Sequence, residues 1–205
     1  MTPKCSSRCV IAVLSLAFSA LAGASLAAPA KPAKKDTQAT PVLVASYGDW
    51  GVYDGTVGKG KICYLLATPK DRTPNDPKRD KSYAFISDRP AEGVKNEVSF
   101  IMGVDIAPFA ASADKGEKAD KKKPAPAAAA PLAVIADETF DLLPKGSDLW
   151  IKNPANEGQM IDQMRKGITL VVKATAKKGG AVADTYALTG FSQAMDRLQK
   201  ECAGK

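Results

Sequence analysis

The chain of 205 residues contains no histidine. Catalysis by a Ser-His-Asp or Cys-His pair needs an imidazole as the general base, so the sequence excludes both forms. Histidine is also the commonest metal ligand among side chains, and only four cysteines are present to replace it. We therefore expect no metal site and no cofactor.

Long apolar runs are also missing after the N-terminal region. Lys4 and Arg8 precede an apolar run at residues 10–21, and small residues follow it up to Ala27. This pattern is typical of a cleaved secretory signal peptide. No later segment approaches the roughly 20 apolar residues of a membrane-spanning helix. The sequence predicts a protein without a transmembrane segment after cleavage near Ala27, located in the periplasm, secreted, or associated with the cell surface.

Cysteine use agrees with export. Cys5 and Cys9 lie within the predicted signal peptide, which leaves Cys63 and Cys202 in the mature chain. An even number of cysteines in an oxidising compartment favours one disulfide, and two buried free thiols are the alternative. Neither cysteine belongs to a CxxC motif, so a thiol oxidoreductase is not indicated.

The positive charge is concentrated in two segments. The chain has 29 Lys and Arg against 22 Asp and Glu, but residues 28–36 hold three lysines and residues 110–131 hold five. The remainder is nearly neutral, which argues against a nucleic-acid-binding face. We expect a signal peptide (1–27), an Ala/Pro/Lys-rich flexible spacer (28–41), and one β-rich domain (42–205) with a disordered insertion at about 108–131. The alternative for the insertion is a basic arm that contacts anionic envelope material.

Alternating apolar and polar residues predict a mainly β fold, a β-sandwich or barrel-like domain of about eight strands. Two short helices complete it, one of them at the C-terminus. The first follows Asn156 and ends at Gly167, and the second covers residues 192–201. We expect Trp50 and Trp150 to be core residues, and Asp49 to act in a turn or at a strand end. The predicted strands are 42–52, 62–68, 82–87, 97–104, 132–143 with a break near Asp137, 149–152, 168–176 and 181–188.

Three motifs resemble sites without meeting their requirements. Residues 55–62 match the GxxxxGK of a phosphate-binding loop, but Ile62 replaces the Ser or Thr, and a strand follows where a helix is needed. The loop at residues 70–81 mixes five cations with its acids, so we interpret it as a solvated loop rather than a calcium site. Asp137 and Glu138 are neighbours, and adjacent strand residues point to opposite faces. We therefore expect no catalytic residues.

Four short motifs, taken in order, resemble the invasion-associated locus B family. They are Tyr47-Gly48-Asp49-Trp50-Gly51-Val52, Cys63-Tyr64-Leu65-Leu66, Met164-Arg165-Lys166-Gly167 and Tyr186-Ala187-Leu188-Thr189-Gly190-Phe191. The resemblance extends from about Tyr47 to Cys202, apart from the insertion. It departs from the family pattern at Tyr53, where members often carry a cysteine. It implies an exported protein of alphaproteobacteria, connected in some pathogens with entry into host cells, with no established catalytic residues.

Together, these features indicate an exported, non-enzymatic interaction protein of the periplasm or cell envelope. Its expected partner is an envelope protein or an anionic envelope component, and not nucleic acid. One alternative is a histidine-free hydrolase or lyase that acts on an envelope polymer through carboxylates such as Asp137, Glu138 and Asp141. Another is a β-barrel carrier of a small apolar ligand.

Overall fold

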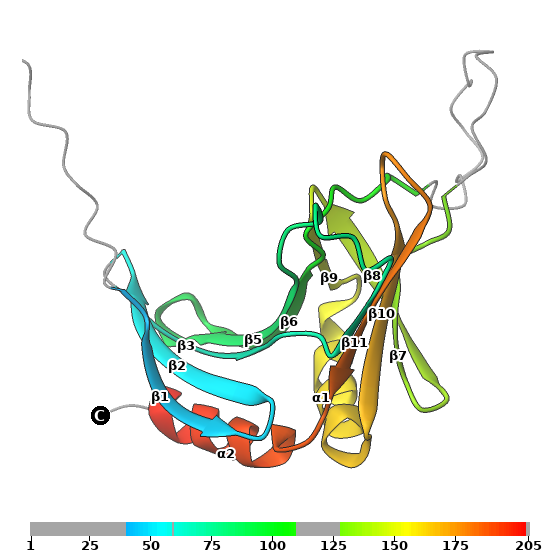
Figure 1. Ribbon diagram of the computed structural model, residues 1–205. Coiled ribbons are helices and arrows are strands. Elements are labelled where there is room, and N and C mark those ends of the chain that lie inside the picture. Colours follow the sequence, from blue (N-terminus) through cyan, green and yellow to red (C-terminus); the bar gives the residue numbers. More distant parts are fainter. Residues whose placement is uncertain (1–39, 59, 110–127, 204–205) are drawn as a thin grey trace, which may run out of the picture. The chain divides into compact units, whose positions relative to one another are not determined.

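A computed structural model describes residues 40–58, 60–109 and 128–203 (Figure 1). The predicted signal peptide (1–27) lies outside the described residues, as do most of the predicted spacer (28–41) and most of the predicted insertion (108–131). The described residues all belong to one compact unit.

The main element is one antiparallel sheet with the strand order β1-β2-β3-β5-β6-β9-β8-β7-β10-β11-β4. The mainly β prediction is confirmed, with eleven strands in place of about eight. The order is linear, with β1 and β4 at its two edges, so of the two expected forms, a sandwich or a barrel-like domain, the described strands do not form a closed barrel. The strands are β1 (Val42–Tyr47), β2 (Trp50–Val57), β3 (Gly60–Ala67), β4 (Asp71–Thr73), β5 (Tyr83–Arg89), β6 (Val94–Ile101), β7 (Leu132–Ile135), β8 (Glu138–Lys145), β9 (Asp148–Ile151), β10 (Thr169–Thr175) and β11 (Ala181–Ala187).

Strand β8 connects the two halves of the sheet. Its residues 138–141 pair with β7, and its residues 142–145 pair with β9. Because β8 changes partner midway, the two halves share one hydrophobic core. Phe100 of β6 and Tyr186 of β11, from different halves, have ring centroids 6.3 Å apart.

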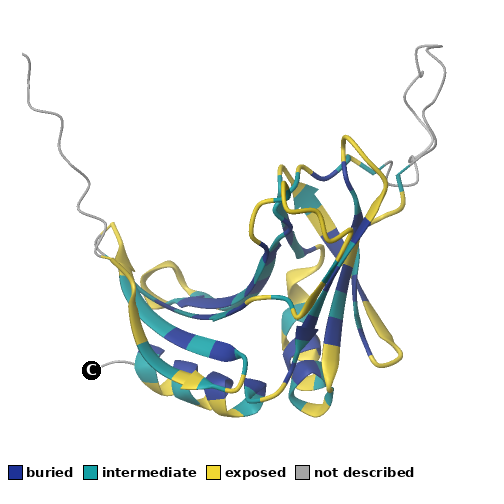
Figure 2. Cartoon of the chain, viewed as in Figure 1, coloured by how far each residue is buried: buried dark blue, intermediate teal, exposed yellow. Residues whose placement is uncertain are grey.

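Two helices cover the core side of the sheet, α1 (Glu157–Lys166) and α2 (Phe191–Cys202). Short 3-10 turns, η1 (Pro90–Glu92) and η2 (Pro154–Asn156), lie before β6 and α1. The apolar side chains of both helices recur every three or four residues and face the core, while their outer faces are exposed (Figure 2). Neither helix of the described residues has the length and apolar character needed to cross a membrane. The buried helical residues are Met160, Ile161, Met164, Phe191, Ala194, Met195, Leu198 and Cys202.

Most predicted elements are found, with three corrections. The strand predicted at 42–52 is a hairpin, because Gly48 adopts a left-handed conformation (φ 55°) and turns the chain between β1 and β2. The loop predicted at 70–81 contains β4, which pairs with β11. Asn156 is the residue before α1 but makes no side-chain capping bond, whereas Asn153 accepts one from the Ala155 N–H at 3.2 Å.

The two tryptophans differ in their surroundings. Trp50 is fully buried, as expected, and its ring meets Phe191 of α2 edge-on with a centroid distance of 4.9 Å. Trp150 is only half-buried, so the core prediction is wrong for this residue. It pairs with Ser99 of β6 and lies on the sheet face opposite the helices.

Candidate functional site

The sheet face opposite α2 carries a group of half-buried aromatic side chains. In β2 and β3, Trp50 and Cys63 point toward α2, so the alternation of strand residues directs Tyr53 and Tyr64 to the other face. Tyr83 and Phe85 of β5 continue the group. We call these four residues the aromatic face; in the part of the chain that the structure describes, no helix lies over it (Figure 1).

The rings of the aromatic face are in mutual contact. Tyr53 and Tyr64 are directly opposite in register and stack nearly parallel, with centroids 5.1 Å apart. The ring centroid of Phe85 is 5.9 Å from that of Tyr64 and 6.0 Å from that of Tyr83. Burial, together with the neighbouring phenol of Tyr53, raises the pKa of Tyr64. The four rings form a continuous apolar strip across three strands.

A charged group borders this strip. The row of Tyr53 and Tyr64 continues through Ser87 to Glu97 of β6. Arg89 holds Glu97 in a bidentate pair, with N–O distances of 2.9 and 3.0 Å. This hydrogen bonding lowers the pKa of Glu97 despite partial burial. Desolvation, with a smaller effect of the Glu97 charge, raises the pKa of the nearby Glu157.

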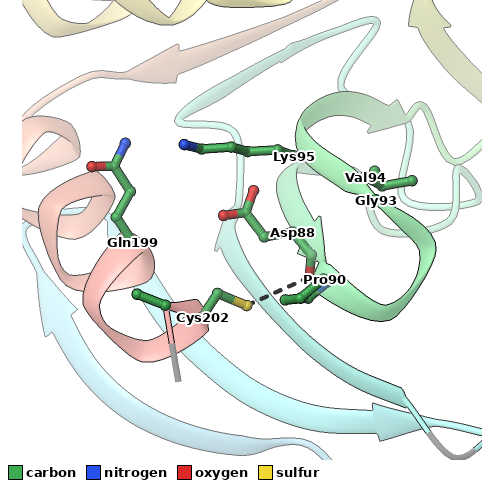
Figure 3. A pocket seen from close by; sticks show the side chains of 8 residues that line it. Asp88, Pro90, Gly93, Val94, Lys95, Gln199 and Cys202 are labelled. Carbon is green, nitrogen blue, oxygen red and sulfur yellow. Dashed lines mark hydrogen bonds between the residues drawn. The ribbon is translucent and has the colours of Figure 1, made fainter. Parts of the chain in front are cut away.

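A pocket of about 390 Å³ lies where η1 and β6 approach the C-terminal end of α2 (Figure 3). The carboxylate of Asp88, the ammonium of Lys95 and the amide of Gln199 point toward the same space. The remaining lining residues are Pro90, Gly93, Val94, Cys202 and Ala203.

The cysteine pair lies beside this pocket. The Cα atoms of Cys63 and Cys202 are 5.8 Å apart, a separation compatible with the expected disulfide between β3 and α2. The sulfur of Cys202 also lies 3.6 Å from the carbonyl oxygen of Asp88. The pair therefore forms part of the boundary between the core and the pocket.

A buried ionic cluster connects the 70–81 segment to β11. Asp184 is fully buried and pairs with Arg79 at 2.6 Å, and Arg72 lies 3.8 Å from its other oxygen. Burial raises the pKa of Asp184, although Ser82 and the two arginines act in the opposite direction. Burial likewise raises the pKa of the Tyr186 hydroxyl. The interpretation of this segment as a solvated loop is wrong at Arg79, whose side chain is only 4% exposed.

The carboxylates considered as catalytic do not gather around one pocket. Asp137 and Glu138 are exposed at the β7–β8 hairpin, and Asp141 pairs with Lys152 at 3.5 Å on the surface. Across residues 40–58, 60–109 and 128–203, no group of three or more His, Cys, Asp or Glu is placed to bind a metal ion. The GxxxxGK segment at 55–62 falls in the β2–β3 hairpin and does not lead into a helix.

Sequence reasoning missed the aromatic face and the pocket. Tyr53, Tyr64 and Phe85 each stand alone in the sequence, and only the register of β2, β3 and β5 brings them together. A usable signal was present in two of these strands: in β3 and β5 the aromatic residues alternate with small or aliphatic buried ones. The sequence did not indicate Asp88 and Lys95 as pocket residues, because their proximity to Gln199 depends on where α2 ends.

Two of the motifs that carry the family resemblance meet in space. Trp50 donates its Nε1–H to the carbonyl oxygen of Ala187 at 3.0 Å. The backbone N–H of Asp49 donates to the carbonyl oxygen of Thr189 at 3.3 Å. Asp49 also forms an ion pair with Lys70, in agreement with its expected place in a turn. These motif residues therefore join the β1–β2 turn to the start of α2.

The comparisons with known proteins support this resemblance over part of the chain. The family model described as invasion associated locus B (IalB) protein matches residues 155–199, which include α1, β10, β11 and most of α2. The recognition of this family from the sequence motifs is confirmed over that segment. No curated protein and no solved structure matches the chain.

Proposed function

We propose that this protein is an exported, non-enzymatic binding protein of the cell envelope, and that it recognises a partner protein through its aromatic face. The observation that carries the proposal is the contact among four half-buried aromatic rings on a sheet face that no helix of the described residues covers. Aromatic residues are enriched at the centres of protein interfaces and often contribute most of their binding energy.

The surroundings of the strip also suit a protein partner. Charged residues of both signs, Arg89 and Glu97, lie at its border, where a polar rim is expected. Leu43 of the edge strand β1 is opposite Tyr53 and is 52% exposed, which extends the apolar surface to the edge of the sheet. A partner that covers this strip would remove a large apolar area from water.

Export is the second part of the proposal. It rests on the signal-peptide pattern of residues 1–27, on a cysteine pair compatible with a disulfide, and on similarity to the IalB family. N-terminal sequencing of protein from the periplasmic fraction should give Ala28 as the first residue. Recovery of the full-length chain from the cytoplasm alone would contradict this part.

The lysine-rich segments within 28–41 and 108–131 add a proposed contact with anionic envelope material. Deletion of residues 110–127 should weaken adhesion to vesicles of anionic phospholipid at low salt and leave the melting temperature nearly unchanged. Unchanged adhesion would remove this contact from the proposal.

Site-specific crosslinking tests the aromatic face directly. p-Benzoylphenylalanine at Tyr53 should trap one dominant envelope protein in cells, whereas the same group at Val171, a half-buried strand residue of the other half-sheet, should not trap it. Binding of the purified partner should then weaken about tenfold or more in a Tyr64→Ser variant, as expected for an interface centre. A Val171→Ser variant serves as the matched control.

Three outcomes would count against this function. Equal trapping from Tyr53 and Val171 would mean that the aromatic face is not the binding surface. Capture of a polysaccharide in place of a protein would contradict the partner class. A folded triple variant of Asp137, Glu138 and Asp141 to alanine that loses function while retaining partner binding would favour the alternative of a carboxylate-based enzyme.

A further inference from the structure

The pocket between η1, β6 and α2 contains a buried carboxylate without an ion-pair partner among the described residues. Asp88 is 5% exposed, and its Oδ1 accepts a hydrogen bond from the backbone N–H of Asn96 at 2.6 Å. No lysine or arginine described by the structure lies within ion-pair distance of it. A buried carboxylate usually has a charged or multiply hydrogen-bonded partner, so Asp88 has capacity for a further donor.

The backbone opposite Asp88 is irregular. The pairing of β5 with β6 shifts register between Ser87 and Arg89, so two residues of β6, Lys95 and Asn96, lie opposite Asp88 in a β-bulge. Asn96, which it holds, has a positive φ of 61° that non-glycine residues rarely adopt. Bulges commonly redirect a side chain near a binding site. Here the bulge lies in β6 at Lys95 and Asn96, and the side chains of Lys95 and Asp88 point into the pocket (Figure 3).

The other polar groups of the pocket complement that charge. Lys95 supplies an ammonium and Gln199 an amide, and both point toward the space in front of Asp88 (Figure 3). One anion and one cation make the charged lining neutral overall. A ligand that contacts both charges would carry a cationic donor and an anionic acceptor on the same small molecule.

We propose that this pocket binds a small zwitterion of the amino-acid or short-peptide class, whose ammonium contacts Asp88 and whose carboxylate contacts Lys95 and Gln199. Pro90, Val94 and the cysteine sulfur supply the apolar surface for its side chains. The volume of about 390 Å³ is within the range of about 300–1,000 Å³ typical of small-molecule sites. This inference is independent of the aromatic face, so either can fail without the other.

Titration of the full mature protein with the dipeptide alanyl-alanine, followed by ¹⁵N–¹H NMR, tests the inference. We expect amide shifts confined to residues 88–95 and 199–203. N-acetyl-alanyl-alanine, which lacks the ammonium, and alanyl-alanine amide, which lacks the carboxylate, should each bind about tenfold more weakly or worse. Equal binding of all three forms, shifts elsewhere, or no shifts at millimolar dipeptide would overturn the proposal.

Variants separate the two charged contacts. Asp88→Asn retains an oxygen that can accept the hydrogen bond from Asn96 and removes the negative charge. It should therefore weaken binding of the dipeptide but not binding of its N-acetyl form. Lys95→Met should weaken binding of the dipeptide but not binding of its amide form. Lys200→Met, an exposed lysine of α2 that does not line the pocket, is the matched control and should bind normally. Unchanged dipeptide affinity in both pocket variants would contradict the assigned contacts.

Discussion

The indole of Trp50 donates its Nε1–H to the carbonyl oxygen of Ala187, a residue 137 positions later in the chain. A buried indole N–H needs such an acceptor, because a buried donor without one costs about 1–3 kcal/mol. The hydrogen bond fixes the first hairpin against the last strand and the start of α2. The resemblance motifs at both ends of this contact therefore have a structural role.

Gly190, at the start of α2, should not tolerate a side chain. Its φ is +84°, and an added Cβ would overlap the carbonyl group of Tyr47. We expect Gly190→Ala to lower the free energy of unfolding by about 2–4 kcal/mol, from backbone strain and steric overlap. Urea denaturation measures the loss. Gly180→Ala, where an added Cβ has open space, should change stability by less than about 1 kcal/mol; equal losses would contradict the predicted contact.

The pair of Arg79 and Asp184 should be necessary for folding stability. Removing Arg79 leaves the buried Asp184 charge with only Arg72, at 3.8 Å, so Arg79→Ala should cost about 3–5 kcal/mol. The neighbouring exposed lysine gives the control, since Lys78→Ala should change stability by no more than about 0.5 kcal/mol. A double variant, Arg79→Met with Asp184→Leu, should recover part of the loss. A loss from Arg79→Ala as small as that of the control would show that the pair is dispensable.

The cysteine pair should stabilise the fold. Its closed loop spans 139 positions, and a loop of that length predicts a difference of about 3–5 kcal/mol between the oxidised and reduced protein. Non-reducing peptide mapping should find the peptides of Cys63 and Cys202 linked. Cys63→Ser and Cys202→Ser should each reproduce the stability of the reduced protein. Separate alkylation of both thiols in periplasmic protein would contradict the prediction.

The pKa of Glu97 should depend on Arg89. Hydrogen bonding to Arg89 lowers this pKa below its ordinary value of 4.5, whereas burial alone would raise it. The folded pKa is depressed, so the pair contributes stability above the unfolded pKa, and this contribution is lost as the pH falls through the folded pKa. In Arg89→Gln the pKa should rise above that of the wild type in an NMR titration. Lys178→Gln, in the β10–β11 turn, should leave it unchanged.

Local sequence signals predicted much of the fold. The break near Asp137 separates β7 from β8, and residues 177–180 lie in the turn between β10 and β11. Apolar spacing located both helices and the buried side of α2. Such features depend on a few adjacent residues, which is why they can be read without tertiary information.

Features that depend on register or distant pairing were not predicted. Strand β4 has only three residues, and it is a strand because β11 supplies its hydrogen bonds. Arg79 carries a charge typical of solvated loops, and only the buried Asp184 accounts for its position. The aromatic face requires the pairing of β2, β3 and β5, and the Asp88 pocket requires a bulge and a helix end to coincide. Neither requirement is visible in any local stretch of sequence.

The late position of α2 determines what the growing polypeptide exposes. The first hairpin is synthesised well over a hundred residues before the helix that covers Trp50 and Cys63. Until then the nascent chain presents an apolar half-sheet, which is the kind of surface that chaperones bind. A premature stop codon before Phe191 would leave that surface permanently open. The codons of α2 therefore decide whether that surface is covered.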